Sequence, residues 1–174
     1  MALSSTVGPL AGLAMFALGL LPAAAQDFGA GNLVIHQPWT RATPGGAQVA
    51  GGYLTVVNKG STLDRLVGGS LAAAEAFGLH EMTSDGGVMR MRPTGPLDIP
   101  PGGSLTLSPS GKHIMFTGLR RGLQEGEQVG GTLVFEHAGT VPVRFTVEGI
   151  GAKSPTGRDR SGPAGQAMPG MDMN

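Results

Sequence analysis

Apolar and polar residues alternate in short stretches along most of the chain, and turn residues separate one stretch from the next. Alternation with a period of two predicts β-strands, because successive side chains of a strand point to opposite faces of a sheet. No stretch shows the longer period of an amphipathic helix of ordinary length. The predicted strands lie in "GNLVIHQPWTRA" (31–42), "AGGYLTVVNKGS" (50–61), "DRLVGGSL" (64–71), "FGLHEM" (77–82), "VMRMR" (88–92), "SLTLSP" (104–109), "KHIMFTGL" (112–119), "QVGGTLVFEH" (128–137) and "TVPVRFTVEGI" (140–150).

The spacing of these strands predicts the fold class. Gly, Pro, Asp and Ser residues lie between them, and short strands separated by such turns are typical of an antiparallel β-sandwich. The first strand is expected to end near Pro38. The segment "LAAAEAF", residues 71–77, is compatible with one helical turn or with part of a connection between strands.

Both ends of the chain differ from the middle. Residues 1–25 carry no charged side chain and end in small residues, which is typical of a cleaved secretory signal peptide. A membrane anchor is the alternative, but Pro9 and Pro22 interrupt the apolar run, and the run is short for a span of ~20 residues. Residues 153–174 are rich in Gly, Pro, Ser and charge and predict a disordered tail. The folded domain is therefore expected to cover residues 26–152.

Composition narrows the possible functions. With 174 residues and 40% hydrophobic content, the chain is long enough for one core and short for two domains. Its formal net charge of +0 gives no indication of nucleic acid or an anionic membrane as a partner. The absence of cysteine excludes a thiolate nucleophile and a cysteine-ligated metal. The chain has no phosphate-loop or nucleophile-elbow motif and no convincing pair of catalytic carboxylates, so we do not expect an enzyme.

Methionine and histidine are concentrated in two short segments, of which the first is "GLHEMTSDGGVMRMRP", residues 78–93. Asp85-Gly86 is a favoured two-residue hairpin turn, because both positions tolerate positive φ. This turn predicts the cross-strand pairs His80 with Met91, Glu81 with Arg90, and Met82 with Met89. A turn at Gly86-Gly87 would instead place Met82 opposite Met91. In either register the histidine and the methionines share one face of the hairpin.

The second segment is "GKHIMF", residues 111–116. Alternation puts Ile114 and Phe116 on the core side of a strand and His113 and Met115 on the other side, beside the hairpin if the strands are neighbours. Any one of these methionines or histidines alone would most simply be a packing or surface residue. Several soft donors on one face, opposite clear apolar residues, instead indicate a metal site, because cores prefer Leu, Ile and Val.

The type of donor predicts the metal. Neutral imidazole and thioether groups favour a soft monovalent ion, which indicates Cu(I). Zinc would require thiolate, imidazole or carboxylate ligands, and calcium would require oxygens. A blue-copper electron-transfer centre requires a cysteine thiolate and is excluded. The pattern therefore predicts a site that holds copper without a redox cycle.

The spacing of the donors resembles the signature of the PCuAC family of periplasmic copper chaperones: His80, ten residues, Met91, twenty-one residues, His113, one residue and Met115. The segments "LHEM", "GVMRMRP", "IPPGGSLTL", "HIMFTGL" and "LQEGE" are similar to the family's pattern as well, and the resemblance extends from "PWTRAT" to "VPVRFTVEG". It implies a cupredoxin-like β-sandwich with Greek-key connections and delivery of copper to the CuA centre of cytochrome c oxidase. The Cu(I) ligands that it implies are His80, Met91, His113 and Met115.

The same resemblance implies where the protein acts and with what. We expect a periplasmic monomer whose partners are the copper ion and a cytochrome c oxidase subunit or another copper-transfer protein. Copper storage or resistance, and a β-sandwich binding module without metal, remain alternatives. Met82 and Met89 stay open between further donors and rim packing. The tail methionines stay open between a copper-capture arm and an ordinary terminus; they are Met168, Met171 and Met173.

Three other residues are weaker functional candidates. His36 beside a strand end and His137 in the segment "EHAGTV" are expected to be surface histidines rather than ligands. Trp39, the sole tryptophan, is expected to be a core anchor or a rim residue.

Overall fold

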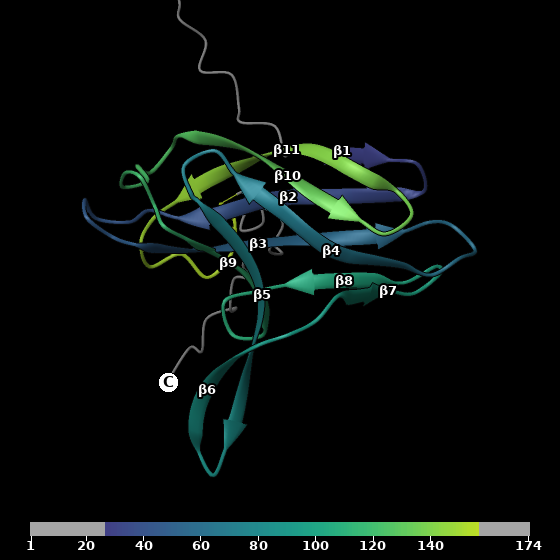
Figure 1. Ribbon diagram of the computed structural model, residues 1–174, viewed down its shortest axis with the longest axis horizontal. Helices are drawn as coiled ribbons and strands as arrows, with labels where there is room; N and C mark the ends of the chain where they lie inside the picture. The colour runs from purple at the N-terminus through teal and green to yellow at the C-terminus, as the bar shows by residue number, and fades with distance from the viewer. Residues whose placement is uncertain (1–26, 157–174) are drawn as a thin grey trace, which may run out of the picture.

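Eleven β-strands and no helix make up residues 27–156, the part of the chain that the computed structural model describes (Figure 1). The strands form one mixed sheet that folds into an open sandwich, which confirms the predicted all-β sandwich class. Within these residues, no helix is long and apolar enough to cross a membrane. The strands are β1 (Asp27–Ala30), β2 (Leu33–Arg41), β3 (Val49–Asn58), β4 (Asp64–Leu71), β5 (Ala76–Asp85), β6 (Val88–Pro93), β7 (Leu97–Ile99), β8 (Ser104–Leu107), β9 (Lys112–Thr117), β10 (Gln128–Phe135) and β11 (Gly139–Glu148).

Every strand predicted from alternation is present, with differences at the edges. The sequence did not predict β1 or β7, which have only 4 and 3 residues. The prediction that the first long strand ends near Pro38 is wrong, because β2 continues past it. The β2–β3 pairing is irregular between His36 and Trp39, and Gln37 has a φ of 46°. This irregularity accommodates a residue that cannot donate a ladder hydrogen bond. The segment 71–77 ends β4, forms a turn and begins β5.

The sheet has the strand order β6-β5-β9-β3-β2-β11-β10-β4-β7. Outside this order, β1 pairs with β2 and β8 pairs with β3. The β2–β11 pair is parallel, over residues 39–41 and 146–148. The sequence predicted only antiparallel pairing, so this pair corrects the prediction. Parallel neighbours need a long crossover between them, and here most of the domain lies between β2 and β11.

Aromatic side chains from three strands of the C-terminal half of the domain lie in one apolar core. Phe116 on β9, Phe135 on β10 and Phe145 on β11 are among the largest fully buried side chains. The rings of Phe116 and Phe145 meet edge to face with centroids 5.4 Å apart. Such a ring pair contributes about 0.5–1.5 kcal/mol beyond its area burial. The inner face of β9 is therefore fixed in the core.

Strand β5 belongs to two pairings at once. Residues 76–81 pair with β9, and residues 80–85 pair with β6. Strand β6 is the last strand of the order at its edge, and all of its residues are exposed. The hairpin of β5 and β6 consequently projects from the body of the sandwich (Figure 1).

The last described residues return to the outer side of the sheet. Arg41 Nε donates a hydrogen bond of 2.7 Å to the carbonyl of Ala152, and Pro155 is buried. The signal peptide predicted for residues 1–25 and most of the tail predicted for residues 153–174 lie outside the described residues. These segment boundaries therefore stay predictions.

Candidate metal site

The side chains predicted as metal ligands lie on three neighbouring strands, with β5 in the middle. Because side chains alternate along each strand and directly paired residues point the same way, all of them share one face of the sheet. The opposite face of β9 carries Ile114 and Phe116, each 0% exposed, as the sequence predicted. The residues are His80 on β5, Met91 on β6, and His113 and Met115 on β9.

His80 and His113 form the centre of this group. They are direct partners in the β5–β9 ladder, and their rings stack with centroids 6.1 Å apart and planes inclined by 30°. Residues that are 33 positions apart in the sequence are thus brought together by strand pairing alone. Two imidazoles at this separation can contribute a nitrogen each to one ion between them.

The His113 ring is oriented by its own backbone. Its Nδ1 lies 3.0 Å from the carbonyl oxygen of Gly111. A carbonyl accepts only, so Nδ1 carries the proton and Nε2 has a free lone pair. A metal-binding histidine is typically held in this way, with one nitrogen bonded to a carbonyl and the other on the ion. His113 is only 5% exposed, so the ring is also held by packing.

His80 has an unsatisfied nitrogen. Its Nδ1 is buried and has no hydrogen-bond partner in the structure, and native proteins rarely leave such an atom unpaired unless it has another role. Burial, and secondarily the neighbouring His113, lower the pKa of His80 from its ordinary value of 6.5. Both effects favour the neutral imidazole, which is the form that binds metal.

Glycines flank Met115 on both neighbouring strands. Gly78 of β5 and Gly51 of β3 are its direct partners, so neither of the directly paired residues has a side chain beside the thioether. A Cβ at Gly78 would lie 3.0 Å from His80 Nε2. A Cβ at Gly51 would collide with the hydroxyl of Tyr53. The two glycines thus leave room for the His80 ring and the Tyr53 ring beside Met115.

The hairpin has the second of the two registers that the sequence allowed. Gly86 and Gly87, with φ of 58° and 83°, occupy the turn. Because glycine has no Cβ, both adopt positive φ without strain. Met91 consequently lies opposite Met82 rather than opposite His80. The favoured turn at Asp85-Gly86 is therefore wrong, whereas the shared face of histidine and methionines is retained.

The same shift changes the charged pairs on the other face of the hairpin. Glu81 lies opposite Arg92 and not opposite Arg90 as predicted. Arg90 instead lies opposite Thr83, and its Nε is 3.9 Å from a carboxylate oxygen of Asp85. Both partners of this ion pair are more than half exposed, so it contributes little to stability.

Harder metal sites are lacking in the described part of the chain. Among residues 27–156, no group of three or more His, Asp or Glu side chains could hold a metal ion. His80 and His113 can therefore be joined in a metal site only by the thioether sulfurs of neighbouring methionines. The donor set is therefore the soft one that favours Cu(I) over Zn²⁺ or Ca²⁺.

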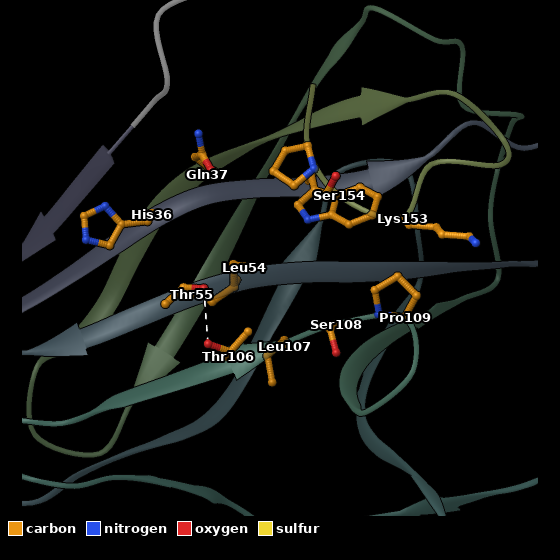
Figure 2. A pocket seen from close by; sticks show the side chains of 12 residues that line it. His36, Gln37, Leu54, Thr55, Thr106, Leu107, Ser108, Pro109, Lys153 and Ser154 are labelled. Atoms are coloured by element: carbon orange, nitrogen blue, oxygen red, sulfur yellow. Dashed lines mark hydrogen bonds between the residues drawn. The ribbon is translucent and has the colours of Figure 1, made fainter. Parts of the chain in front are cut away.

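A second feature is a pocket lined by residues of β2, β3 and β8. The lining of this small pocket includes His36, Thr106, Trp39 and Lys153 (Figure 2). Trp39 is 4% exposed and packs on Tyr53 with ring centroids 4.5 Å apart, which fits the predicted anchor role. With a single imidazole and no thioether in its lining, this pocket does not resemble a copper site.

The two remaining histidines lie outside the metal site, as predicted. His36 Nδ1 is 2.8 Å from a carboxylate oxygen of Asp27 on β1. His137 lies in the turn between β10 and β11, and its backbone N–H donates to Asp64 at 3.0 Å. Neither the β1–β2 pair nor the β10–β11 pair is hydrogen-bonded to β5, β6 or β9.

The glycines beside the candidate ligands were not predicted from the sequence. A glycine precedes each histidine by two residues, Gly78 before His80 and Gly111 before His113. In a strand, residues two apart share a face, so this pattern indicates room or a free carbonyl beside each ring. That repeated spacing is the signal that could have revealed them.

Comparison with known proteins is consistent with this geometry. Residues 33–147 match the LpqE-like family model, described as "Putative lipoprotein LpqE-like". The chain is 35% identical over 131 residues to "Putative lipoprotein Lxx21020" of Leifsonia xyli subsp. xyli (strain CTCB07), covering 74% of this chain and 78% of that protein. The chain belongs to the LpqE-like family, which is the PCuAC family that its sequence resembles.

Solved structures show the same fold. A structure called the copper-bound PCuAC domain from PmoF2 superposes with a TM-score of 0.62 at 28% identity, covering 71% of this chain and 98% of that one. Apo-DR1885 from Deinococcus radiodurans gives a TM-score of 0.54 at 29% identity, covering 84% and 97%. CuI-DR1885 from the same organism gives 0.51 at 31% identity, covering 78% and 85%.

Proposed function

We propose that the protein is an exported copper(I) chaperone that binds one Cu(I) and transfers it to a membrane cuproenzyme. The proposed ligands are His80, Met91, His113 and Met115. All four are uncharged when they bind, so the ion keeps its charge in the site. A monovalent ion tolerates this better than a divalent one at a site that is partly exposed.

The facing pair of His80 and His113 carries this proposal. His113 presents a free Nε2 because its Nδ1 is bonded to a carbonyl, and His80 has a buried nitrogen without a partner. A bound ion would satisfy these groups. Met115 lies on the same face two residues after His113, and Met91 lies diagonally across the ladder from His80. Diagonal neighbours are about 7–8 Å apart, which long side chains can span.

Similar proteins support copper(I) as the cargo. The solved structures that share the fold include one named as a copper-bound PCuAC domain and one named CuI-DR1885. A chain with the same fold and with soft donors gathered on one sheet face is expected to bind the same ion. The lipoprotein descriptions of the family and of the relative support an exported, envelope-associated location. We infer a periplasmic monomer with a cleaved signal peptide.

The proposed acceptor is the CuA centre of cytochrome c oxidase, as the family resemblance implies. A transfer site must release its ion, and a partly exposed site with thioether ligands suits release better than a buried thiolate site. The test is incubation of the Cu(I)-loaded protein with the copper-free soluble CuA domain of an oxidase subunit. The appearance of the CuA absorbance supports delivery. Retention of copper by the donor would instead favour copper storage or resistance.

The binding site itself is tested by competition titration with a Cu(I) chelator under reducing, oxygen-free conditions. Met91→Leu removes the sulfur and keeps an apolar side chain, and His113→Ala removes a buried imidazole. Loss of an outer-sphere partner alone costs about 10–100-fold in metal affinity, so loss of a ligand should cost at least as much. Val88→Leu, on the other face of β6, and His36→Ala are the matched controls. If both site variants compete as well as wild type, the proposed ligand set is wrong.

A further inference from the structure

We propose that Met82 and Met89 form a second, weaker Cu(I) subsite on the hairpin, which loads and unloads the main site through Met91. The inference rests on the proposed function, because it requires Cu(I) at the four-ligand site. It assigns a role to two thioethers that the four-ligand site does not use.

Strand register places the extra sulfurs beside the main site. Met82 is the direct partner of Met91, and Met89 is the direct partner of Ser84. Directly opposed residues have Cβ atoms about 4.5–5.5 Å apart, and diagonal neighbours about 7–8 Å apart. Met82 is therefore within reach of Met91 directly and of Met89 diagonally. A flexible thioether side chain can contact an ion held between any two of these positions.

Exposure argues against a packing role for Met89 and Met91, whereas Met82 is half-buried. Met89 is 54% exposed and Met91 is 50% exposed. Every residue of β6 is exposed, and β6 lies at the edge of the sheet. A methionine used as a core filler lies in a core, whereas these lie on a projecting hairpin. Exposed apolar side chains gathered on one face mark an interaction site more often than they mark packing.

Charge is also distributed in favour of a cation on this face. The paired residues on the methionine face are His80, Met82, Ser84, Met89, Met91 and Pro93. None of these carries a fixed charge. Arg90 and Arg92 alternate onto the other face, opposite Thr83 and Glu81. A Cu(I) ion on the methionine face is thus kept apart from the guanidinium groups of its own hairpin.

The donors change from exposed to buried along the path from the hairpin tip to the main site. Met89 near the tip is 54% exposed, Met91 is 50% exposed, and His113 is 5% exposed. An ion first held by Met89 and Met82 can gain Met91, then exchange the first two sulfurs for the imidazoles of His80 and His113. The gain of Met91 adds one copper–sulfur bond, and each later exchange forms one copper–nitrogen bond as one copper–sulfur bond breaks. The ion remains Cu(I) throughout, so no oxidant or reductant takes part.

The experiment uses the full chain labelled with ¹³C at the methionine methyl groups, titrated with Cu(I) under reducing, oxygen-free conditions. At the first equivalent the methyl signals of Met91 and Met115 should shift. Beyond it the signals of Met82 and Met89 should shift in turn. The double variant Met82→Leu and Met89→Leu should keep the first equivalent at unchanged affinity, lose the second, and load and release copper more slowly in stopped-flow transfer to a chelator. Val88→Leu, equally exposed on the same strand, should behave as wild type.

The outcomes separate this inference from the proposed function. If the main site binds Cu(I) but the Met82 and Met89 signals stay in place and the double variant exchanges copper at the wild-type rate, the subsite does not exist. If Val88→Leu slows exchange as much as the double variant, the effect belongs to the hairpin surface and not to sulfur, which also overturns the inference. If wild type shows no shift at Met91 or Met115, the four-ligand site is wrong and the inference falls with it.

Discussion

Strands β9 and β6 contribute to the same proposed site but are held in opposite ways. Strand β9 lies between β3 and β5, and its reverse face carries Ile114 and Phe116 in the core. Strand β6 is an exposed edge strand. One half of the site, His113 and Met115, is therefore preorganised by the fold. The other half, Met91, lies on the projecting β5–β6 hairpin, which can move without loss of the core.

This division fits a protein that must both bind and release an ion. A preorganised half lowers the entropic cost of binding. Elements that open easily are drawn from the least stable parts of a fold, and Met91 lies in such a part. His80 connects the two halves, because it is one of the two residues of β5 that pair with both neighbours. Each of the following predictions tests this comparison.

The largest expected effect comes from the reverse face of β9. Phe116→Ala removes a ring that packs against Phe145 and Phe77, and such a change in a core costs about 3–5 kcal/mol of unfolding free energy. Met91→Ala, at an exposed position on β6, should change stability by no more than about 0.5 kcal/mol. Urea unfolding of the copper-free variants measures both. Equal losses for the two variants would show that β6 is as much a part of the core as β9.

A smaller effect is expected where the two halves meet. In Gly78→Ala the new Cβ would lie 3.0 Å from His80 Nε2, so the imidazole must shift by a few tenths of an ångström. Moving a side chain about 30° off its rotamer costs about 0.5–1.5 kcal/mol, which corresponds to up to about tenfold in affinity. Chelator competition measures the loss of Cu(I) affinity. Gly130→Ala, in a strand position with open space around it, is the control and should bind as wild type. Unchanged affinity in Gly78→Ala would mean that the His80 ring does not need this space.

The smallest effect concerns the pH dependence of stability in the copper-free protein. Burial and the neighbouring His113 lower the pKa of His80 in the folded state, so the unfolded chain takes up this proton first as the pH falls. Stability contributed by neutral His80 is therefore present above pH of about 6.5 and is lost as the pH falls through the lower folded value. Urea unfolding between neutral and mildly acidic pH should show part of this slope disappear in His80→Gln. An identical slope in wild type and His80→Gln would contradict the stated environment of His80.

Much of the site could be predicted from alternation alone. The shared face of His80, Met82, Met89 and Met91 survives either hairpin register, because both turns preserve the period of two. The register itself could not be predicted with the same certainty, since Asp85-Gly86 and Gly86-Gly87 both suit a tight turn. The sequence favoured the turn at Asp85-Gly86. The structure has the turn at Gly86-Gly87, where both glycines adopt positive φ.

Contacts between segments that are distant in the sequence could not be predicted from the alternation pattern. The pairing of β5 with β9 places His80 opposite His113, yet β6, β7 and β8 lie between them along the chain. From the sequence alone, the two clusters are expected to converge only if their strands are neighbours. Strands β1 and β7 were missed because runs of 4 and 3 residues show too little alternation. The parallel β2–β11 pair depends on the whole topology and has no local signal.

The hairpin turn also determines how the length of the β5–β6 hairpin can change. Removing the facing residues Asp85 and Val88 together would shorten the hairpin and leave Met82 opposite Met91. Removing one residue from β6 alone would invert every later side chain of that strand up to Pro93, because one step of register exchanges the two faces. Met91 would then point to the face of Glu81 and Thr83, and Arg92 would take its place on the face of His80. The donors would no longer lie on one side. Insertions or deletions in this hairpin therefore keep the donors on one face only when facing residues are added or removed in pairs. The same constraint applies to natural variation and to engineering of the hairpin.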